Sequence, residues 1–316
     1  MLNPWLSAHI FLIVSYALAI VGVAHMLRHR RSPGSTMAWL VTFILLPLVG
    51  TVLYLMFGGR KLRMQKRTPP RIAFESTQTL SEEAAHAFAD TLLRYGAAPV
   101  AVGNQVTLCK DGAAGYQTLV ELIEQARNRI CLMTFIFAHD AVGRDILRKL
   151  SDKARAGVEV KVLVDGLGSM KTPRRCFREL VKAGGQFAVF QPVVHLPFRT
   201  RTNLRNHRKI LIADGSRSFA GGMNITCEDL YVEGTQGGWR DVSLALDGPA
   251  VQHLEAVFWE DWQFATRDTG GRAWGSESLP QAGSEVVQVL ASGPDVPHDP
   301  MYSASLAAIY RASRRI

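Results

Sequence analysis

The sequence predicts an α/β fold, a mixed β-sheet between helices, preceded by a two-helix transmembrane hairpin. Three observations support this prediction. Two long uncharged runs lie near the N-terminus, apolar strand-like runs alternate with amphipathic helical patterns from about residue 105, and a strand–turn–strand pattern follows near the middle. We expect four parts: the hairpin at 1–59, a basic linker at 60–100, the α/β lobe at 101–291, and the start of a truncated second lobe at 292–316.

The hairpin prediction rests on residues 6–27 and 37–57, which contain no Asp, Glu, Lys or Arg. Each run is long enough to cross a hydrocarbon core of about 30 Å at about 1.5 Å per helical residue. A cleaved signal peptide is the alternative for the first run, but a basic leading region and a clear cleavage site are missing. Basic residues flank the second run on both sides, so the membrane orientation stays open.

The net charge of +9 comes from the N-terminal part of the chain. Residues 1–74 contain nine of the 36 Lys and Arg residues and no Asp or Glu, which leaves 27 basic residues to balance 27 acidic ones. Basic clusters beside membrane segments favour anionic lipid headgroups, by about 1 kcal/mol per residue. The charge therefore predicts contact with anionic membrane lipid, and we expect no nucleic-acid partner.

The four cysteines show no metal-binding or redox spacing. We expect reduced structural thiols in a protein that faces a reducing compartment, and neither a metal nor a cofactor. The cysteines are Cys109, Cys131, Cys176 and Cys227.

The α/β lobe follows from hydrophobic periodicity. Helices are expected near 81–95, 116–129, 143–156, 173–183 and 249–266, and strands near 130–137, 158–164, 186–190, 241–246 and 286–290. The strand at 130–137 is almost continuously apolar, as is typical of a strand buried on both faces. We expect the aromatic side chains of Phe258, Trp259 and Trp262 to pack in the core.

Residues 207–224 form two strands around an Asp-Gly turn and end in a Gly-Gly break before Asn224. His207 and Lys209 are two residues apart, so their side chains leave the same face of a strand. An imidazole can attack phosphorus, and an ammonium and an amide can stabilise the phosphoryl oxygens. The carboxylate of Asp214 can orient a histidine ring. Chance would give the His, Lys and Asp spacing in about one such sequence in fifty, but the strand and turn pattern argues against coincidence.

The His-x-Lys-x-x-x-x-Asp pattern at 207–214, followed by Gly-Gly-x-Asn at 221–224, resembles the signature of the phospholipase D superfamily. The stretch at 203–209 resembles the bacterial cardiolipin synthase branch of that superfamily. Further stretches similar to that branch lie at 38–39, 46–50 and 54–58 in the hairpin, and at 239–241, 248–251 and 258–262 after the motif.

This resemblance implies a phospholipase D-like lobe that transfers a phosphatidyl group from one phosphatidylglycerol to another and releases glycerol. His207, Lys209 and Asp214 would be the catalytic residues, with His207 either forming a phosphatidyl-histidine or acting as the acid. Asn224, Gly222 and Asp241 would lie in the substrate-binding part of the site, without a metal.

Other polar residues near strand ends have simpler explanations. For Asp140 and Asp165, loop capping is favoured over a place in the site. His139 and His195 show no partner pattern and are expected in loops or on the surface.

An internal repeat bears on the mechanism. Residues 116–130 align without gaps on 302–316, which indicates a duplicated domain whose second copy stops at this point. The resemblance implies that two motifs meet in the working enzyme, one histidine being the nucleophile and the other the acid. This chain has one motif, so a homodimer or a second lobe would have to supply the other.

Two alternatives stay open: a membrane-bound phospholipase D that hydrolyses phosphatidyl lipids, and a catalytically silent truncated lobe. For location, we expect a multi-pass protein of the bacterial inner membrane with its catalytic lobe in the cytoplasm.

Overall fold

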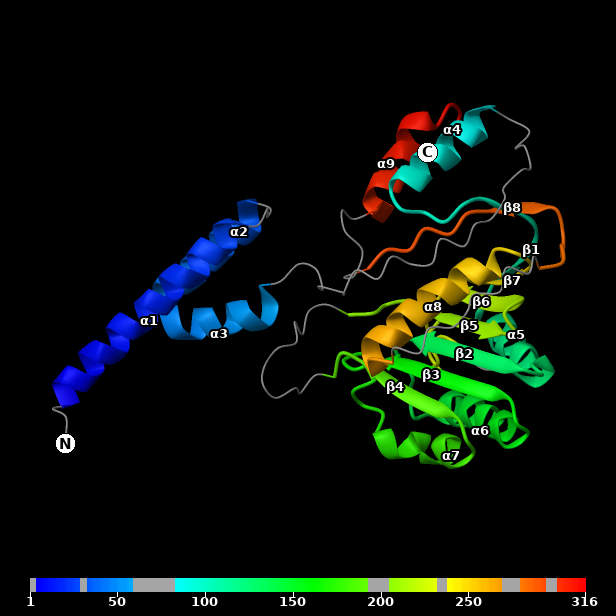
Figure 1. Ribbon diagram of the computed structural model, residues 1–316, viewed down its shortest axis with the longest axis horizontal. Helices are drawn as coiled ribbons and strands as arrows, with labels where there is room; N and C mark the ends of the chain where they lie inside the picture. Colours follow the sequence, from blue (N-terminus) through cyan, green and yellow to red (C-terminus); the bar gives the residue numbers. More distant parts are fainter. Residues whose placement is uncertain are drawn as a thin grey trace. The chain divides into compact units, whose positions relative to one another are not determined.

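The computed structural model describes residues 4–28, 33–58, 83–192, 205–231, 238–268, 279–293 and 300–316. Most of the predicted basic linker and His195 lie outside these residues. The described residues belong to two units, the N-terminal helices and the α/β lobe from residue 83 onward (Figure 1).

The N-terminal unit contains three helices, α1 (Pro4–Leu27), α2 (Pro33–Leu45) and α3 (Pro47–Phe57). Among the described helices, the segment Trp5–Leu27 is the one that is long and apolar enough to cross a membrane. The second apolar run is broken at Leu46, with φ −137° and ψ 67°, because the residue before a proline disfavours the helical region. It therefore forms two short helices instead of the continuous span expected from the sequence.

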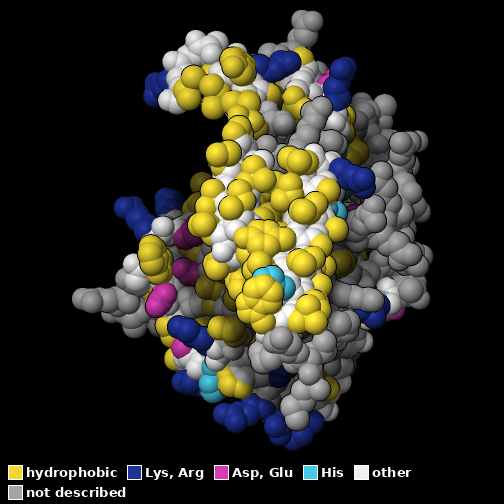
Figure 2. Space-filling model, turned by 90° about the vertical axis from the view of Figure 1, so that its left-hand side faces the viewer, with side chains coloured by type: hydrophobic (Ala, Val, Ile, Leu, Met, Phe, Trp, Pro, Cys, Tyr) yellow, Lys and Arg dark blue, Asp and Glu magenta, His cyan; other side chains and the backbone are white. Residues whose placement is uncertain are grey.

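The three helices share a small aromatic core. Phe43 and Tyr54 are buried, and a Cβ atom at Gly22 would lie 2.8 Å from the Phe43 ring, so glycine permits this close approach. His25 Nδ1 lies 2.9 Å from the Tyr54 hydroxyl. Hydrophobic side chains cover the outer surface of these helices, as expected for a surface that faces lipid (Figure 2).

The α/β lobe contains an eight-stranded sheet in the order β4-β3-β2-β5-β6-β7-β1-β8. The strands are β1 (Ala101–Cys109), β2 (Arg129–Thr134), β3 (Glu159–Asp165), β4 (Gln186–Phe190), β5 (Ile210–Ala213), β6 (Arg217–Gly221), β7 (Ser243–Asp247) and β8 (Glu285–Val287). Strands β2, β3 and β4 are parallel to one another, whereas the other neighbouring pairs are antiparallel. The predicted mixed sheet is confirmed.

Helices cover both faces of this sheet. α5 (Gly112–Gln125), α6 (Ala141–Arg155) and α7 (Arg178–Lys182, after a 3-10 turn at Arg174–Phe177) lie on one face, and α8 (Val251–Thr266) lies on the other (Figure 1). Leu119, Ile146 and Leu211 are fully buried in the core on the α5–α6 side. Phe258 and Trp262 on α8 are also buried, which confirms their predicted core role.

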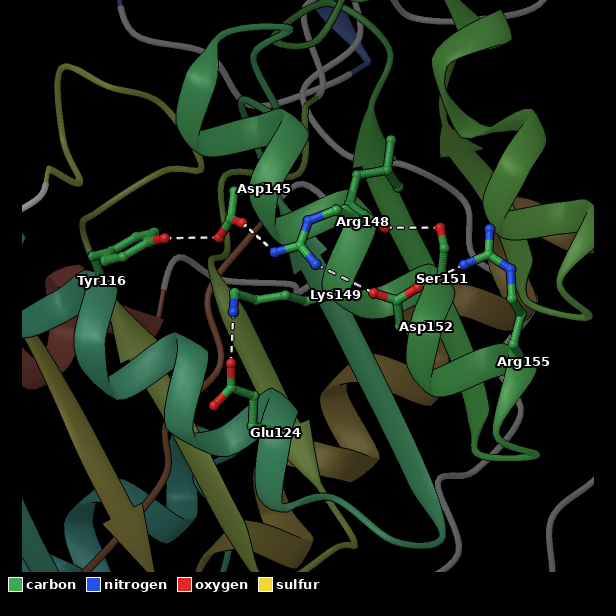
Figure 3. Close-up of polar contacts among 9 residues, drawn as sticks. Tyr116, Glu124, Asp145, Arg148, Lys149, Ser151, Asp152 and Arg155 are labelled. Atoms are coloured by element: carbon green, nitrogen blue, oxygen red, sulfur yellow. Dashed lines mark hydrogen bonds and ion pairs between the residues drawn. The ribbon is translucent and has the colours of Figure 1, made fainter.

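A polar network joins the outer surfaces of α5 and α6 (Figure 3). The Tyr116 hydroxyl donates to the Asp145 carboxylate (2.7 Å), and the Arg148 guanidinium donates to the same carboxylate (2.8 Å). The Lys149 ammonium forms an ion pair with Glu124 (2.5 Å). Burial, followed by the hydrogen bond to Asp145, raises the pKa of Tyr116 to about 12. In each ion pair one partner is more than half exposed, so each pair contributes little to stability.

α4 (Glu83–Arg94) and α9 (Pro300–Arg311) pack against each other, and α4 agrees with the helix expected near 81–95. The backbone N–H of Ala98 donates to Val289 O (2.8 Å), which ties the segment after α4 to the segment after β8. α9 contains most of the second repeat copy. Its Ala304 is buried, whereas Tyr310 remains exposed.

Candidate active site

His207 and Lys209 lie at one edge of the sheet, where β2, β3 and β6 end and β5 and β7 begin. Antiparallel pairing of β5 with β2 and β6 brings the segment before β5 beside the segments that follow those strands. The Gly221 N–H donates to Lys209 O (3.3 Å), continuing the β5–β6 ladder into the motif. Residues far apart in the sequence therefore meet around His207.

A buried cation supports the imidazole of His207. Lys209 Nζ lies 2.8 Å from His207 Nδ1 and 2.9 Å from the His207 carbonyl oxygen, and the Lys209 side chain is buried. An ammonium only donates hydrogen bonds, so Nδ1 accepts in this arrangement and the ring is neutral. Phe135 packs against the imidazole, with 4.4 Å between ring centroids. The His207 ring nevertheless remains accessible to solvent.

The surroundings favour the neutral imidazole. Burial, followed by the nearby charge of Lys209, lowers the pKa of His207, and Asp165 and Asp241 partly offset this effect. Burial also lowers the pKa of Lys209. The carboxylates of Asp241 and Asp229 raise this pKa, but by less than burial lowers it. A neutral imidazole at pH 7 is the form that can act as a nucleophile.

The three residues predicted to bind substrate also lie at this edge. A Cβ atom at Gly222 would lie 2.0 Å from Asp241 Oδ1, so only glycine leaves room for this carboxylate. Asn224 Oδ1 accepts from the Ile136 N–H (3.1 Å), and Asn224 Nδ2 donates to Asp229 (2.8 Å). The second amide hydrogen of Asn224 has no acceptor among the described residues and is available to a ligand oxygen.

The structure does not bring Asp214 together with His207. The two residues stand at opposite ends of β5, roughly 23 Å apart along an extended strand. The Asp214 carboxylate accepts backbone N–H groups of Arg127 (2.9 Å), Asn128 (2.7 Å) and Arg129 (2.9 Å). This corrects the position expected from the sequence: Asp214 closes the turn between α5 and β2, because seven residues of extended strand carry it away from the imidazole.

Asp214→Ala is expected to reduce stability by about 2 kcal/mol, because three N–H groups lose their acceptor. Any turnover at the His207 site, measured per folded molecule, should stay within about twofold of the parent, because Asp214 lies far from the imidazole. Denaturant unfolding of the detergent-solubilised chain, with turnover measured in parallel, tests this. A variant that is stable but inactive would contradict a structural role.

The stabilisation by Asp214 should depend on pH. Burial alone would raise its pKa, but the backbone N–H groups of Arg129, Arg127 and Asn128 more than reverse this effect, so its pKa is lowered. The contribution is therefore present above the ordinary aspartate pKa of about 4 and is lost as pH falls through the lower folded-state value. Parent and variant should converge in stability under strongly acidic conditions.

Behind the imidazole, Asp261 on α8 forms contacts that the sequence did not reveal. Its carboxylate is fully buried and accepts from Asn206 Nδ2 (2.8 Å) and from Arg208 Nη1 (2.7 and 2.8 Å). Asn206 Oδ1 also accepts the Arg208 N–H (3.0 Å). The residues before and after His207, Asn206 and Arg208, are thus bonded to α8. Since successive side chains of an extended segment point in opposite directions, the imidazole points away from α8.

Two other aspartates confirm their predicted capping role. Asp140 accepts the Gly143 N–H (2.9 Å) at the start of α6. Asp165 accepts the N–H groups of Leu167 (2.8 Å) and Gly168 (3.0 Å) in the loop after β3. Among the described residues, no group of three or more His, Cys, Asp and Glu side chains is arranged to hold a metal.

Comparisons with known proteins identify sequences that are similar to this chain. Residues 119–262 match the family model for the cardiolipin synthase, phospholipase D-like domain, and residues 17–59 match the phospholipase D-nuclease N-terminal model. Cardiolipin synthase 1 of Bacillus anthracis is 31% identical over 99% of this chain and 66% of its own length. Cardiolipin synthase of Alkalihalophilus pseudofirmus is 33% identical over 93% of this chain and 61% of its own length.

Among solved structures, the phospholipase D family member Nuc from Salmonella typhimurium is 18% identical, with a TM-score of 0.37, over 52% of this chain and 97% of its own. The chain spans less than two thirds of the length of the curated cardiolipin synthases named above.

The N-terminal family match and the apolar helix α1 indicate a membrane protein. The chain belongs to the bacterial cardiolipin synthase branch of the phospholipase D superfamily.

Proposed function

We propose that this chain supplies the membrane anchor and one catalytic half-site of a cardiolipin synthase-type phosphatidyltransferase. The observation that carries the proposal is the neutral, accessible imidazole of His207 beside the buried ammonium of Lys209. The imidazole is suited to attack phosphorus, and the ammonium to stabilise the charge that develops on the phosphoryl oxygens.

The reaction proceeds in two displacements. Lys209 turns an N–H group from His207 Nδ1 to the phosphoryl oxygens, and the Nδ1 lone pair that this frees attacks the phosphorus of one phosphatidylglycerol while Nε2 keeps its proton. A P–N bond forms, and the P–O bond to glycerol breaks. Glycerol leaves with a proton from a general acid. A hydroxyl of the second phosphatidylglycerol then attacks phosphorus and gives its proton to the group that acted as the acid in the first step, while the P–N bond breaks. This yields cardiolipin and restores both the imidazole and the acid.

The other groups at the sheet edge assist this chemistry. Lys209 and the free amide hydrogen of Asn224 hold the phosphoryl oxygens, and Asp241 tunes the charge of the His207–Lys209 pair. Asp214 acts on the fold through the turn before β2. Under the alternative role, His207 protonates the leaving group while a second histidine attacks.

The second histidine comes from a second catalytic lobe or from a second copy of this chain. In the cell we place the chain in the bacterial inner membrane, with more than one membrane pass and with the lobe on the cytoplasmic side. Phosphatidylglycerol is the proposed substrate, and the nine basic residues within 1–74 favour anionic lipid around the anchor.

Product analysis in phosphatidylglycerol liposomes tests the proposal, with Lys209→Met as the matched variant of similar length. The parent should release cardiolipin and glycerol, and the variant should be about 100- to 1,000-fold slower because it lacks the charge on the phosphate. Phosphatidic acid in place of cardiolipin would support the hydrolase. If the chain alone is inactive, it is assayed after fusion to the part of the Bacillus anthracis relative that it does not cover, and inactivity there would support a silent lobe.

A further inference from the structure

Large hydrophobic side chains are exposed at the edge of the sheet that carries the candidate site. In the loop after β3, Leu167 is 42% exposed and Met170 is 62% exposed. Trp239, just before β7, is 70% exposed. Since β3 and β7 lie on opposite sides of β5 in the sheet, these side chains belong to loops on both sides of the motif. Exposed apolar groups collected at one edge are typical of a contact surface.

The loop after β3 is fixed to the catalytic segment by a single carboxylate. Asp165 Oδ1 accepts the N–H of Leu167 (2.8 Å), and Asp165 Oδ2 accepts the N–H of Asn206 (3.1 Å), the residue before His207. Asp165 is almost completely buried, so this link is shielded from water. The position of Leu167 is therefore coupled to that of the imidazole.

A second link runs through Phe135. The Ser169 hydroxyl donates to the Phe135 carbonyl oxygen (3.0 Å), and the Phe135 ring packs against His207. Met170 follows Ser169 directly. The exposed part of the loop is thus a rim of the candidate site and not a separate surface.

The same loop continues into exposed cations. Lys171, Arg174 and Arg175 are exposed, and no Asp or Glu occurs at 166–178. Within the described residues, no ion pair or side-chain hydrogen bond engages these three side chains. By contrast, the exposed cations Arg148 and Arg155 on α6 both pair with carboxylates.

We propose that this rim is a bilayer-contact surface. Leu167 and Met170 enter the interface of an anionic membrane, Trp239 on the other side of the motif lies at headgroup level, and the cations at 171, 174 and 175 bind lipid phosphates. The lobe then presents the sheet edge containing His207 to the bilayer.

The composition of the rim favours a bilayer over another protein. Short apolar side chains next to Lys and Arg suit the boundary between acyl chains and anionic headgroups, where tryptophan is also enriched. The inference rests on the proposed function in one respect: a phosphatidyl substrate reaches His207 from the membrane surface.

The test measures depth in the membrane and needs no turnover. In the full chain, with the half-buried Cys176 and Cys227 changed to serine, a fluorophore is attached at Met170→Cys. The matched control is Val181→Cys on α7, a side chain 53% exposed on the same lobe. Both proteins are reconstituted in phosphatidylglycerol vesicles that contain nitroxide-labelled lipid.

The probe at 170 should be quenched several-fold more strongly than the probe at 181. Replacing Lys171, Arg174 and Arg175 together with glutamine should reduce the quenching at 170, as should phosphatidylcholine in place of phosphatidylglycerol. Equal quenching at both positions, or quenching at 170 that is insensitive to lipid charge and to the triple substitution, would overturn the inference. Selective quenching, with no lipid turnover even after fusion to the part of the Bacillus anthracis relative that the chain does not cover, would overturn the proposed function and leave the contact surface standing.

Discussion

Replacing His207 with glutamine is expected to lower phosphatidyl transfer by about 10⁴-fold or more, as for removal of other covalent nucleophiles. Glutamine is close in size and keeps a polar group near Lys209, so the loss should come from the missing nucleophile. The effect should appear in kcat, because lipid binding depends on other groups at the sheet edge.

The fold of this variant should be unchanged, because the His207 ring is exposed and lies outside the core. Unfolding midpoints of parent and variant therefore serve as the control. Transfer within about tenfold of the parent by a folded His207→Gln chain would exclude this histidine from the chemistry.

The largest expected loss of stability comes from Asp261→Ala. The carboxylate has no exposed surface and accepts from Asn206 and Arg208, and the Arg208 side chain is only 13% exposed. Removing one partner of a buried ion pair leaves the other charge uncompensated, which costs about 3–5 kcal/mol. Denaturant unfolding of the full chain in detergent measures the loss.

Asp152→Ala is the matched control on α6. Asp152 also receives two arginine side chains, from Arg148 and Arg155, but it is 53% exposed. Its loss should change stability by no more than about 1 kcal/mol. Similar effects of the two substitutions would contradict the account of Asp261 as a buried anchor of the catalytic segment.

Local patterns predicted most of the secondary structure. The apolar run at 6–27 became α1, and the buried strands β2 and β3 followed from short apolar stretches bounded by helices. The break in the second apolar run was not predicted, because hydropathy counts apolar residues, whereas Pro47 acts on the backbone of Leu46. Strand order was not predicted, because pairing across the sheet depends on contacts between distant segments.

In the candidate site, too, local features were predicted and contacts between distant segments were not. His207 and Lys209 were paired correctly because two residues apart on a strand share a face, a local rule. Asp214 belongs to the same motif, but the motif gives only its distance along the sequence and not its position in the fold. Because β5 lies between Lys209 and Asp214, Asp214 is at the opposite edge of the sheet. The role of Asp261 depends on contacts with Asn206 and Arg208 across more than 50 residues, for which a single sequence gives no signal.

Trapping the covalent intermediate tests the central claim most directly. The chain, joined to a second catalytic lobe if it needs one, is mixed with phosphatidylglycerol, quenched in base to protect the P–N bond, and digested for mass spectrometry. We predict a phosphatidyl adduct on His207 that is absent from His207→Gln and is depleted by excess glycerol, which reverses the first displacement. Turnover in which the only adduct lies on a different residue, or in which no adduct forms, would contradict His207 as the nucleophile.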